Sequence, residues 1–399
     1  MMADLSLLAA VALGHLCLVV LAINIWHGLG SNGRWLERAT LVVLALALAA
    51  PVAVLAVGGR PWSDWPVPLR LYAAACLAVG WLGLPAVTIR RALRRVPPGI
   101  EGDAETLDLT ARVGADRLIG QGRFAGLLRL PGNAAWRLQL LDWRVTVPLL
   151  PTACEGLSLV HLSDLHFARC FDRLYFETII AAAATWEADL IVFTGDLIDD
   201  EAAAAWIVPL LSRLRGRCGQ FAILGNHDQL HHPRRIAHEL RRSGFEVVDG
   251  RWMRLDLDGA TVALGGTSAP WGPALDPGAM PEADFRLLLS HTPDLFPEAV
   301  AWGIDLMLAG HVHGGQVRLP VVGPVLMPSR YSRRYDRGFF QAGRTLLHVS
   351  QGVAGKHPIR FGCLPEISRL TLRAAAPRSE AALDDRPEES LALPGDCLG

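Results

Sequence analysis

The sequence lacks any cysteine pattern that would indicate a disulfide framework or a thiolate metal site. Its seven cysteines are an odd number, and no two of them form a Cys-x-x-Cys pair. Cys17 and Cys76 lie inside long apolar segments. Such cysteine usage is typical of a reducing compartment. The net charge is only −1 and no nucleic-acid-binding motif is present, so the sequence predicts no nucleic-acid partner.

Charged residues are nearly absent from three apolar segments in the first quarter of the chain. These segments are Leu5–Trp26, Ala39–Val57 and Leu69–Ile89, and Arg70 is the one charged residue within them. About 20 predominantly apolar residues are enough for a helix to cross a bilayer. A signal peptide is a poor alternative for the first segment, because Asp4 precedes it and no Lys or Arg does. The sequence therefore predicts a multi-pass membrane protein with three transmembrane helices.

Arginines predict the orientation of this membrane region. Arg34 and Arg38 lie between the first and second segments, whereas only Arg60 lies between the second and third. Four more arginines follow the third segment, at Arg90, Arg91, Arg94 and Arg95. Lys and Arg near helix ends favour the cytoplasmic side of a membrane. With three spans the two most basic segments share that side, so the rest of the chain is expected in the cytoplasm. Two or four spans would reverse the prediction.

Polar side chains follow five apolar runs that are expected to be buried strands. The runs are Leu157–Leu162, Leu190–Thr194, Phe221–Leu224, Phe285–Leu289 and Ile304–Ala309. The motifs that follow them are Asp164-Leu165-His166, Gly195-Asp196, Gly225-Asn226-His227-Asp228, Ser290-His291 and Gly310-His311-Val312-His313. Ligands at the carboxyl ends of several strands can converge on one edge of a sheet. The glycines that open three of these motifs are expected to permit a sharp turn or a close backbone approach there.

These residue types suit a pair of divalent metal ions. Carboxylate, imidazole and amide oxygen are ligands for manganese, iron(II) or zinc, and none of the five motifs contains a cysteine. A carboxylate can bridge two cations about 3.5–4 Å apart, and a metal-bound water with a pKa of about 7 is a nucleophile for phosphorus. His227 is expected to donate a proton to the leaving group, with Asp228 orienting its imidazole. The motifs therefore predict hydrolysis of a phosphoester by metal-bound hydroxide.

The five motifs resemble the calcineurin-like metallophosphoesterase superfamily. Its pattern is Asp-x-His, Gly-Asp, Gly-Asn-His-Asp/Glu, a lone His and Gly-His-x-His, and the resemblance covers roughly residues 143–375. The flanking residues 314–320 and 358–366 are similar to a bacterial, membrane-linked subgroup, whose substrates include a UDP-linked diacylated glucosamine. The resemblance implies two divalent ions, manganese first, with iron or zinc as alternatives. It places one ion among Asp164, His166, Asp196 and His313, and the other among Asp196, Asn226, His291 and His311. Asp196 would be the bridge and His227 the general acid.

Other polar residues leave alternatives open. His15, His161 and His348 sit inside apolar runs and are expected to be structural, while Asp199 and Asp200 are expected to begin a helix at Glu201. Four arginines among aromatic residues, Arg330, Arg333, Arg334 and Arg337, could grip a diphosphate or lie on anionic lipid headgroups. An ordinary solvated loop is the alternative for them. Trp271 could line a substrate pocket or have a structural role.

The predicted fold class is α/β, a sandwich of two mixed β-sheets flanked by helices and preceded by an all-α transmembrane region. The expected divisions are 1–95 for the membrane region, 96–142 for a linker and lead-in segment, 143–373 for the metallophosphoesterase domain and 374–399 for a disordered tail. Helices are expected over Phe171–Trp186, Glu201–Arg215 and Pro233–Arg242, a first strand over Trp143–Leu149, and a hairpin around Asp258-Gly259.

The predicted function is a membrane-anchored, dinuclear phosphoesterase that cleaves a phosphodiester or pyrophosphate bond. Because a soluble nucleotide would not require a tethered enzyme, an amphiphilic substrate is preferred, such as a UDP-linked acylated sugar or a phospholipid-derived diester. The alternatives are a phosphomonoesterase, a cyclic-nucleotide phosphodiesterase, or a non-catalytic membrane sensor or scaffold that uses the metal domain for binding. The sequence does not predict the oligomeric state.

Overall fold

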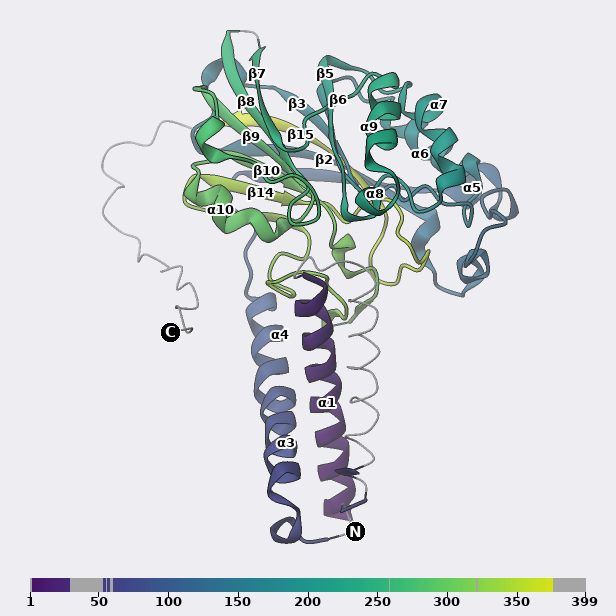
Figure 1. Cartoon of the computed structure of the whole chain (residues 1–399), viewed down its shortest axis with the longest axis vertical. Coiled ribbons are helices and arrows are strands. Elements are labelled where there is room, and N and C mark those ends of the chain that lie inside the picture. Colours follow the sequence, from purple (N-terminus) through teal and green to yellow (C-terminus); the bar gives the residue numbers. More distant parts are fainter. Residues whose placement is uncertain are drawn as a thin grey trace.

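Two β-sheets packed face to face form the body of the protein in the computed structural model (Figure 1). The structure describes residues 2–28, 53–54, 56–57, 60–257, 259–320 and 322–375. The larger sheet has the strand order β1-β2-β15-β3-β4-β5-β6. Its strands are β1 (Ile100–Asp108), β2 (Arg137–Val147), β15 (Glu366–Ala374), β3 (Ser158–Leu162), β4 (Ala188–Thr194), β5 (Gly216–Ile223) and β6 (Glu246–Val247).

The smaller sheet has the order β13-β14-β10-β9-β8-β7. Its strands are β13 (Gly338–Ala342), β14 (Thr345–Val349), β10 (Leu306–Ala309), β9 (Phe285–Ser290), β8 (Ala260–Thr267) and β7 (Arg251–Leu257). A separate two-stranded ribbon, β11 (Arg318–Leu319) with β12 (Gly323–Pro324), follows the last metal motif. The predicted hairpin is confirmed, because β7 and β8 pair antiparallel from Arg251↔Gly266 to Leu257↔Ala260.

The strands that precede the polar motifs run parallel within each sheet. β3, β4, β5 and β6 are parallel neighbours, as are β8, β9, β10 and β14. Apolar side chains from both sheets fill the space between them, including Leu159, Val192, Leu264, Leu287 and Leu308. Burial of this apolar surface drives the two sheets together. All five predicted strands are confirmed, and each ends just before its polar motif.

Helices cover the outer faces of the sandwich. α6 (Arg173–Ala183), α7 (Ile207–Leu211) and α9 (Pro233–Arg242) pack on the larger sheet, and α10 (Phe296–Ala301) packs on the smaller one (Figure 1). Two short helices, α5 (Leu109–Val113) and α8 (Asn226–Leu230), complete the body. The predicted helix Glu201–Arg215 is instead a 3₁₀ turn (Glu201–Trp206) followed by the short α7. Pro209 explains the break, because it has no N–H to donate to the turn before it.

The predicted boundary at residue 143 is too late. β1 pairs with β2 along its whole length, from Ile100↔Val145 to Asp108↔Arg137, and β2 lies beside β15. The predicted lead-in segment therefore contains strands of the larger sheet, and residues 100–142 belong to the body. β1 is an edge strand with almost all of its side chains exposed. Its sequence therefore lacks the apolar alternation that would predict a strand. The predicted tail lies almost entirely outside the described residues.

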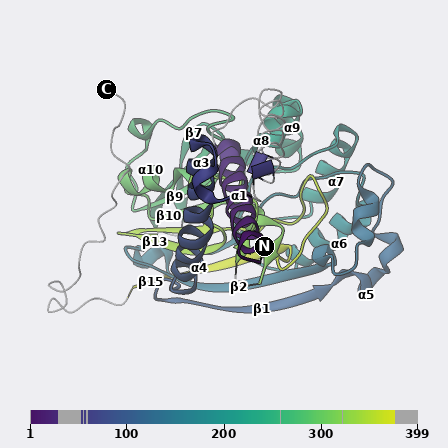
Figure 2. The same cartoon turned by 90° about the horizontal axis from the view of Figure 1, so that it is seen from below.

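A helical stalk projects from the body (Figures 1 and 2). α1 (Met2–Gly28) lies beside α3 (Val67–Ala78), which continues through a π-helical turn (Val79–Gly83) into α4 (Leu84–Ala92). The helices touch at Gly14, where an added Cβ would lie 1.8 Å from the carbonyl oxygen of Cys76. Small residues at such contacts let helix backbones approach closely. Among the described residues, Ser6–Asn24 and Val67–Ala92 are long and apolar enough to cross a membrane. The predicted span 39–57 lies largely outside them.

Both stalk helices end at the body of the protein. Near the carboxyl end of α1, the Asn24 side-chain oxygen accepts a hydrogen bond of 2.8 Å from the backbone N–H of Met327. Just beyond α4, Arg94 contacts Asp336 at 2.8 Å. At the opposite end of the stalk, Leu7 and Leu8 pack in one apolar cluster with Leu69 and its neighbours. The two helices therefore run parallel, both towards the body.

Candidate metal centre

The backbone adopts a left-handed conformation at five of the seven predicted metal ligands. The φ angles are 52° at Asp164, 45° at His166, 59° at Asp196, 69° at His311 and 50° at His313. Such angles are uncommon for residues other than glycine and are found where the surrounding structure holds them for a function. They turn the chain sharply just beyond β3, β4 and β10 and aim the polar side chains at one another.

Glycines allow the motif backbones to approach these ligands closely. An added Cβ at Gly225 would lie 2.1 Å from Asp196 Oδ1, and one at Gly310 would lie 1.8 Å from Ser163 Oγ. Neither distance is compatible with a larger residue. Gly195 has a left-handed φ of 94°. The prediction that these glycines permit a turn or a close approach is therefore confirmed.

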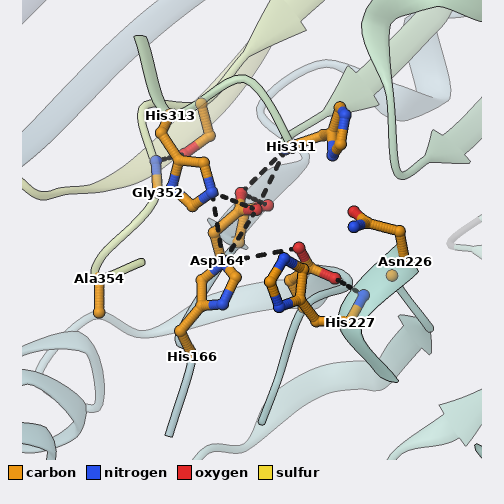
Figure 3. Close-up of polar contacts among 12 residues, drawn as sticks. Asp164, His166, Asn226, His227, His311, His313, Gly352 and Ala354 are labelled. Atoms are coloured by element: carbon orange, nitrogen blue, oxygen red, sulfur yellow. Dashed lines mark hydrogen bonds and ion pairs between the residues drawn. The ribbon is translucent and has the colours of Figure 1, made fainter. Parts of the chain in front are cut away.

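Four side chains from three motifs form the first group of candidate ligands. The ligand atoms of Asp164, His166, Asp196 and His313 all lie within 4.8 Å of one another. Figure 3 shows Asp164, His166 and His313 of this group. His166 Nε2 is 3.2 Å from His313 Nε2 and 3.5 Å from Asp196 Oδ2. Two nitrogens bound to one ion at about 2.1 Å each lie roughly this far apart.

The second group shares Asp196 with the first. The ligand atoms of Asp196, His291 and His311 lie within 4.8 Å of one another. His291 Nε2 is 3.4 Å from Asp196 Oδ2 and 2.9 Å from the Asn226 side-chain oxygen. Asp196 Oδ2 thus faces His166 on one side and His291 on the other. This is the position that a bridging oxygen between two ions requires.

Buried polar atoms without partners show that this site fits cations. Asp196 Oδ2 and His311 Nε2 are buried, and neither has a hydrogen-bond partner within the described chain. A buried polar atom without a hydrogen-bond partner destabilises the folded protein unless a ligand binds it. Burial lowers the pKa of His311 and of His313 to about 3, so both imidazoles are neutral and able to coordinate. Burial opposes protonation of His291, but Asp196 and Asp164 raise its pKa to about 9. The carboxylates therefore stabilise a cation here, whether a proton or a metal ion.

Hydrogen bonds outside the cluster orient two of the imidazoles. His291 Nδ1 lies 2.8 Å from the carbonyl oxygen of Thr194, so Nδ1 carries a proton and Nε2 is the ring nitrogen that faces Asp196 and would bind a metal. His166 Nδ1 lies 2.8 Å from Asp199 Oδ2, with the same consequence. A carbonyl or carboxylate behind a histidine ligand fixes its tautomer and raises its basicity.

His227 faces the cluster but uses a different carboxylate from the predicted one. Its Nδ1 contacts Asp199 Oδ1, and its backbone N–H donates to Asp196 Oδ1 at 2.8 Å. Asp228 is fully buried and accepts hydrogen bonds from the backbone N–H groups of Gly225, Leu197 and Ile198. The prediction that Asp228 orients His227 is therefore wrong.

Asp199 joins His166 and His227 through its two oxygens. Burial opposes its ionisation, but the two histidines hold its pKa well below the usual range. The sequence favoured a place at a helix start for Asp199, with contact to the site as the alternative, and it predicted no carboxylate role for Asp199 behind the histidines. The signal that could have revealed it is its position three residues after Asp196, on the same loop. Asp228, in contrast, ties the loop of Asp196 to the loop of Asn226.

The remaining candidates lie at different distances from the ligands. The Trp271 ring centroid is 4.6 Å from that of His311 and 5.8 Å from that of His291, so Trp271 borders the second group of ligands. None of the contacts recorded for Arg330, Arg333 and Arg334 involves a metal ligand. These arginines belong to the segment that meets the stalk. His161 and His348 contact each other between the sheets, 3.0 Å apart at their Nδ1 atoms, as expected of structural residues.

Comparison with known proteins identifies the family. The calcineurin-like phosphoesterase family model matches residues 157–315, which include all five polar motifs. An uncharacterized metallophosphoesterase of Bacillus subtilis is 32% identical over 255 residues, which are 59% of this chain and 86% of the relative. The chain belongs to the calcineurin-like metallophosphoesterases.

Two further relatives of this metallophosphoesterase have more specific names. A phosphodiesterase of Escherichia coli is 30% identical over 54% of this chain and 81% of the relative. A bovine transmembrane protein with a metallophosphoesterase domain is 29% identical over 61% of this chain, and the match spans 59% of that protein's length. The family and the ligand set together make the chain a metal-dependent phosphoesterase, a hydrolase.

Proposed function

We propose that this metallophosphoesterase is a membrane-anchored enzyme with two divalent ions, which hydrolyses a phosphodiester or pyrophosphate bond in an amphiphilic substrate. The observation that carries the proposal is the contact of both stalk helices with the segment that leaves the metal centre. That segment starts at His313, and its residues Met327 and Asp336 contact Asn24 and the end of α4. The segment that follows the last ligand motif therefore contacts both stalk helices.

Different residues of the chain would have different roles in such a reaction. Asp164, His166, Asp196 and His313 would hold one ion, and Asp196, Asn226, His291 and His311 the other. Bound there, the ions would supply Lewis acidity towards the phosphoryl oxygens and lower the pKa of coordinated water. His227 would donate a proton to the leaving oxygen from Nε2, because Asp199 occupies Nδ1. Trp271 would limit the space on the side of His311. Manganese is the preferred ion, with iron or zinc as alternatives.

The surface of the stalk supports its insertion into a membrane. Only 17% of the residues in each apolar window of α1 and of the α3–α4 helix are buried in the protein. A core helix of a soluble protein would be largely covered, whereas lipid can cover these faces. α1 ends at the body, whereas α3 begins at the far end of the stalk. The predicted span 39–57 falls between these two helices in the sequence, and three spans with the cytoplasmic orientation given by the arginines remain our proposal.

A pair of substrates with one chromophore tests the proposal. We expect the full-length protein in mixed micelles with Mn(II) to cleave p-nitrophenyl hexadecyl phosphate with a higher kcat/KM than p-nitrophenyl methyl phosphate. The reacting diester is the same in both, so the difference reports the alkyl chain alone. Equal kcat/KM values would reject the amphiphilic substrate while keeping the diesterase. A preference for p-nitrophenyl phosphate would favour the monoesterase, and no turnover of any of the three would favour a binding role.

A further inference from the structure

Three arginines converge on one carboxylate where the stalk meets the catalytic body. Arg91 Nη1 is 2.7 Å from Asp336 Oδ2, and Arg94 Nη1 is 2.8 Å from Asp336 Oδ1. Arg318 Nη2, from β11, is 2.9 Å from Asp336 Oδ2. Within the described part of the chain, Asp336 is the only carboxylate that forms an ion pair with any of them. Three positive charges against one negative charge leave an excess of two.

Two more arginines add to this excess. Arg333 reaches the carbonyl oxygen of Val322 at 3.5 Å, and Arg337 Nη1 donates to Gln351 Oε1 at 2.8 Å. Neither of these arginines has an ion pair with a carboxylate among the described residues. Burial lowers the pKa of Arg333, and the nearby charge of Arg91 lowers it further. Partly buried positive charges without counterions are unfavourable, so this surface attracts an anion. The five arginines are called the junction cluster below.

The junction cluster lies where the apolar helix surface ends. The second apolar stretch ends at Ala92, so Arg91 and Arg94 flank its last residue. Their side chains are 30% and 32% exposed, while those of Arg318 and Asp336 are almost fully buried. In an inserted helix this position is the depth of the lipid headgroups, where anionic phosphates are concentrated. Both arginine side chains are therefore partly open to phosphates at this depth.

We propose that the junction cluster binds the phosphate of an anionic phospholipid as a site separate from the metal centre. Guanidinium groups suit this ligand because their planar N–H pairs match phosphate oxygens. Arg91 and Arg94 would supply the donors, and the lipid phosphate would compete with Asp336 for them. The inference rests on the membrane insertion proposed above, and it assigns these arginines to a bound lipid and not to the hydrolysed substrate.

The junction cluster also touches the loop of a metal ligand. Arg318 Nη1 donates to the carbonyl oxygen of Gly314 at 2.5 Å, and Gly314 directly follows His313. Cys363 Sγ lies 3.2 Å from the carbonyl oxygen of His313 itself. A lipid that binds Arg91 and Arg94 would leave Asp336 paired with Arg318, which holds this loop. A lipid bound at the junction cluster is therefore connected to the loop of His313 through Arg318 and the Gly314 carbonyl.

Lipid binding to matched variants of the full-length protein tests the site. Native mass spectrometry of protein released from phosphatidylcholine nanodiscs containing phosphatidylglycerol gives the apparent Kd for the anionic lipid. We expect Arg91→Gln/Arg94→Gln to raise this Kd roughly 25-fold, about fivefold for each arginine. The control Arg90→Gln/Arg95→Gln removes the same charge from exposed positions of the same segment. High salt screens exposed charges. Measured at high salt, the Kd of this control variant should therefore differ from the wild-type Kd by less than about twofold.

A substitution that should strengthen lipid binding distinguishes a lipid site from a structural role of the arginines. Asp336→Asn removes the competing anion, so we expect tighter binding of phosphatidylglycerol. Arg91→Lys/Arg94→Lys, which keeps the charge, should retain most of the binding. Equal losses in the two Gln double variants, or no tightening in Asp336→Asn, would overturn the site. Reconstitution and turnover of p-nitrophenyl methyl phosphate are measured on the same samples. Failure of wild type to reconstitute or to turn over would instead count against the proposed membrane-anchored enzyme.

Discussion

The catalytic edge and the space between the two sheets both hold buried histidines, but among the described residues these two groups differ in whether carboxylates lie beside them. His291, His311 and His313 follow the ends of β9 and β10 and meet Asp164 and Asp196. His161 and His348 lie within β3 and β14 and meet each other and Thr194. His291 and His311 are buried like His161 and His348, so burial alone does not separate the two groups.

Nearby carboxylates and backbone conformation separate the two groups. Asp196 has an oxygen without a partner between the ligand histidines, whereas His161 has both ring nitrogens occupied by His348 and Thr194. Burial lowers the pKa of His161 to about 3, so this imidazole stays neutral at physiological pH. A histidine beyond a strand end can turn towards a carboxylate, while a histidine inside a strand is fixed by the pleat.

Of the substitutions that test this contrast, removal of the shared carboxylate should reduce activity most. Asp196→Asn places a neutral amide at the atom that both ligand groups share. We expect kcat to fall by about 10³-fold or more and the metal content to drop below that of wild type. Turnover of a chromogenic diester and elemental analysis of the purified protein measure the two effects. Wild-type activity in this variant would contradict the bridging position.

Removing His227 should reduce turnover while leaving the metal in place. His227→Ala deletes an imidazole that belongs to the catalytic edge but to neither ligand group. We expect kcat to fall roughly 10²–10⁴-fold with unchanged metal content. A substrate with a better leaving group needs less protonation, so its rate should fall less. Equal losses for good and poor leaving groups would argue against proton donation by His227.

Asp199→Asn should reduce activity to an intermediate extent, because Asp199 acts through His166 and His227. The amide can no longer hold His166 and His227 in one orientation as a charged acceptor. We expect a loss of roughly 10–100-fold in activity and a shifted pH profile. Asp200→Asn is the matched control, since Asp200 pairs with the exposed Arg169 and caps a helical turn. Its activity should stay within about twofold of wild type. Equal effects of the two substitutions would show that Asp199 has no special role.

Changing the interior histidines should alter stability and leave catalysis intact. Because the folded-state pKa of His161 is about 3 and the unfolded value about 6.5, the unfolded chain binds more protons below pH 6.5. Stability is therefore lost as the pH falls below 6.5, by up to about 1.4 kcal/mol per pH unit. In His161→Gln, whose side chain does not titrate, the drop in Tm between pH 7 and pH 5 should be smaller at fixed Mn(II). Turnover should stay within about twofold. An unchanged drop in Tm would contradict this account.

The sequence was sufficient to predict the strands of the catalytic edge and the residues that gather there. Each ligand motif follows an apolar run, and parallel strands bring their carboxyl ends together, so proximity follows from pattern. The partner of His227 could not be predicted in the same way. Asp228 is its neighbour in sequence, but its carboxylate points into the body towards backbone N–H groups, while Asp199 arrives from another loop.

Contacts between distant, polar segments were also beyond sequence reasoning. β1 has no apolar face, so nothing in its pattern indicates a strand. Arg91 and Asp336 are 245 positions apart, and neither residue type nor spacing predicts that they meet. Sequence patterns describe which side of an element is buried. They do not describe which charged residue on one surface finds a partner on another.

The left-handed backbone at the ligand positions restricts how this family member can change over time. Asparagine and aspartate tolerate this conformation better than other non-glycine residues do, whereas β-branched side chains are strongly disfavoured there. An Asp→Asn change at residue 164 or 196 would therefore silence the enzyme without unfolding its loop. A change to valine would remove a ligand and strain the chain together. Descendants that lose activity but keep the fold should carry asparagine at these positions.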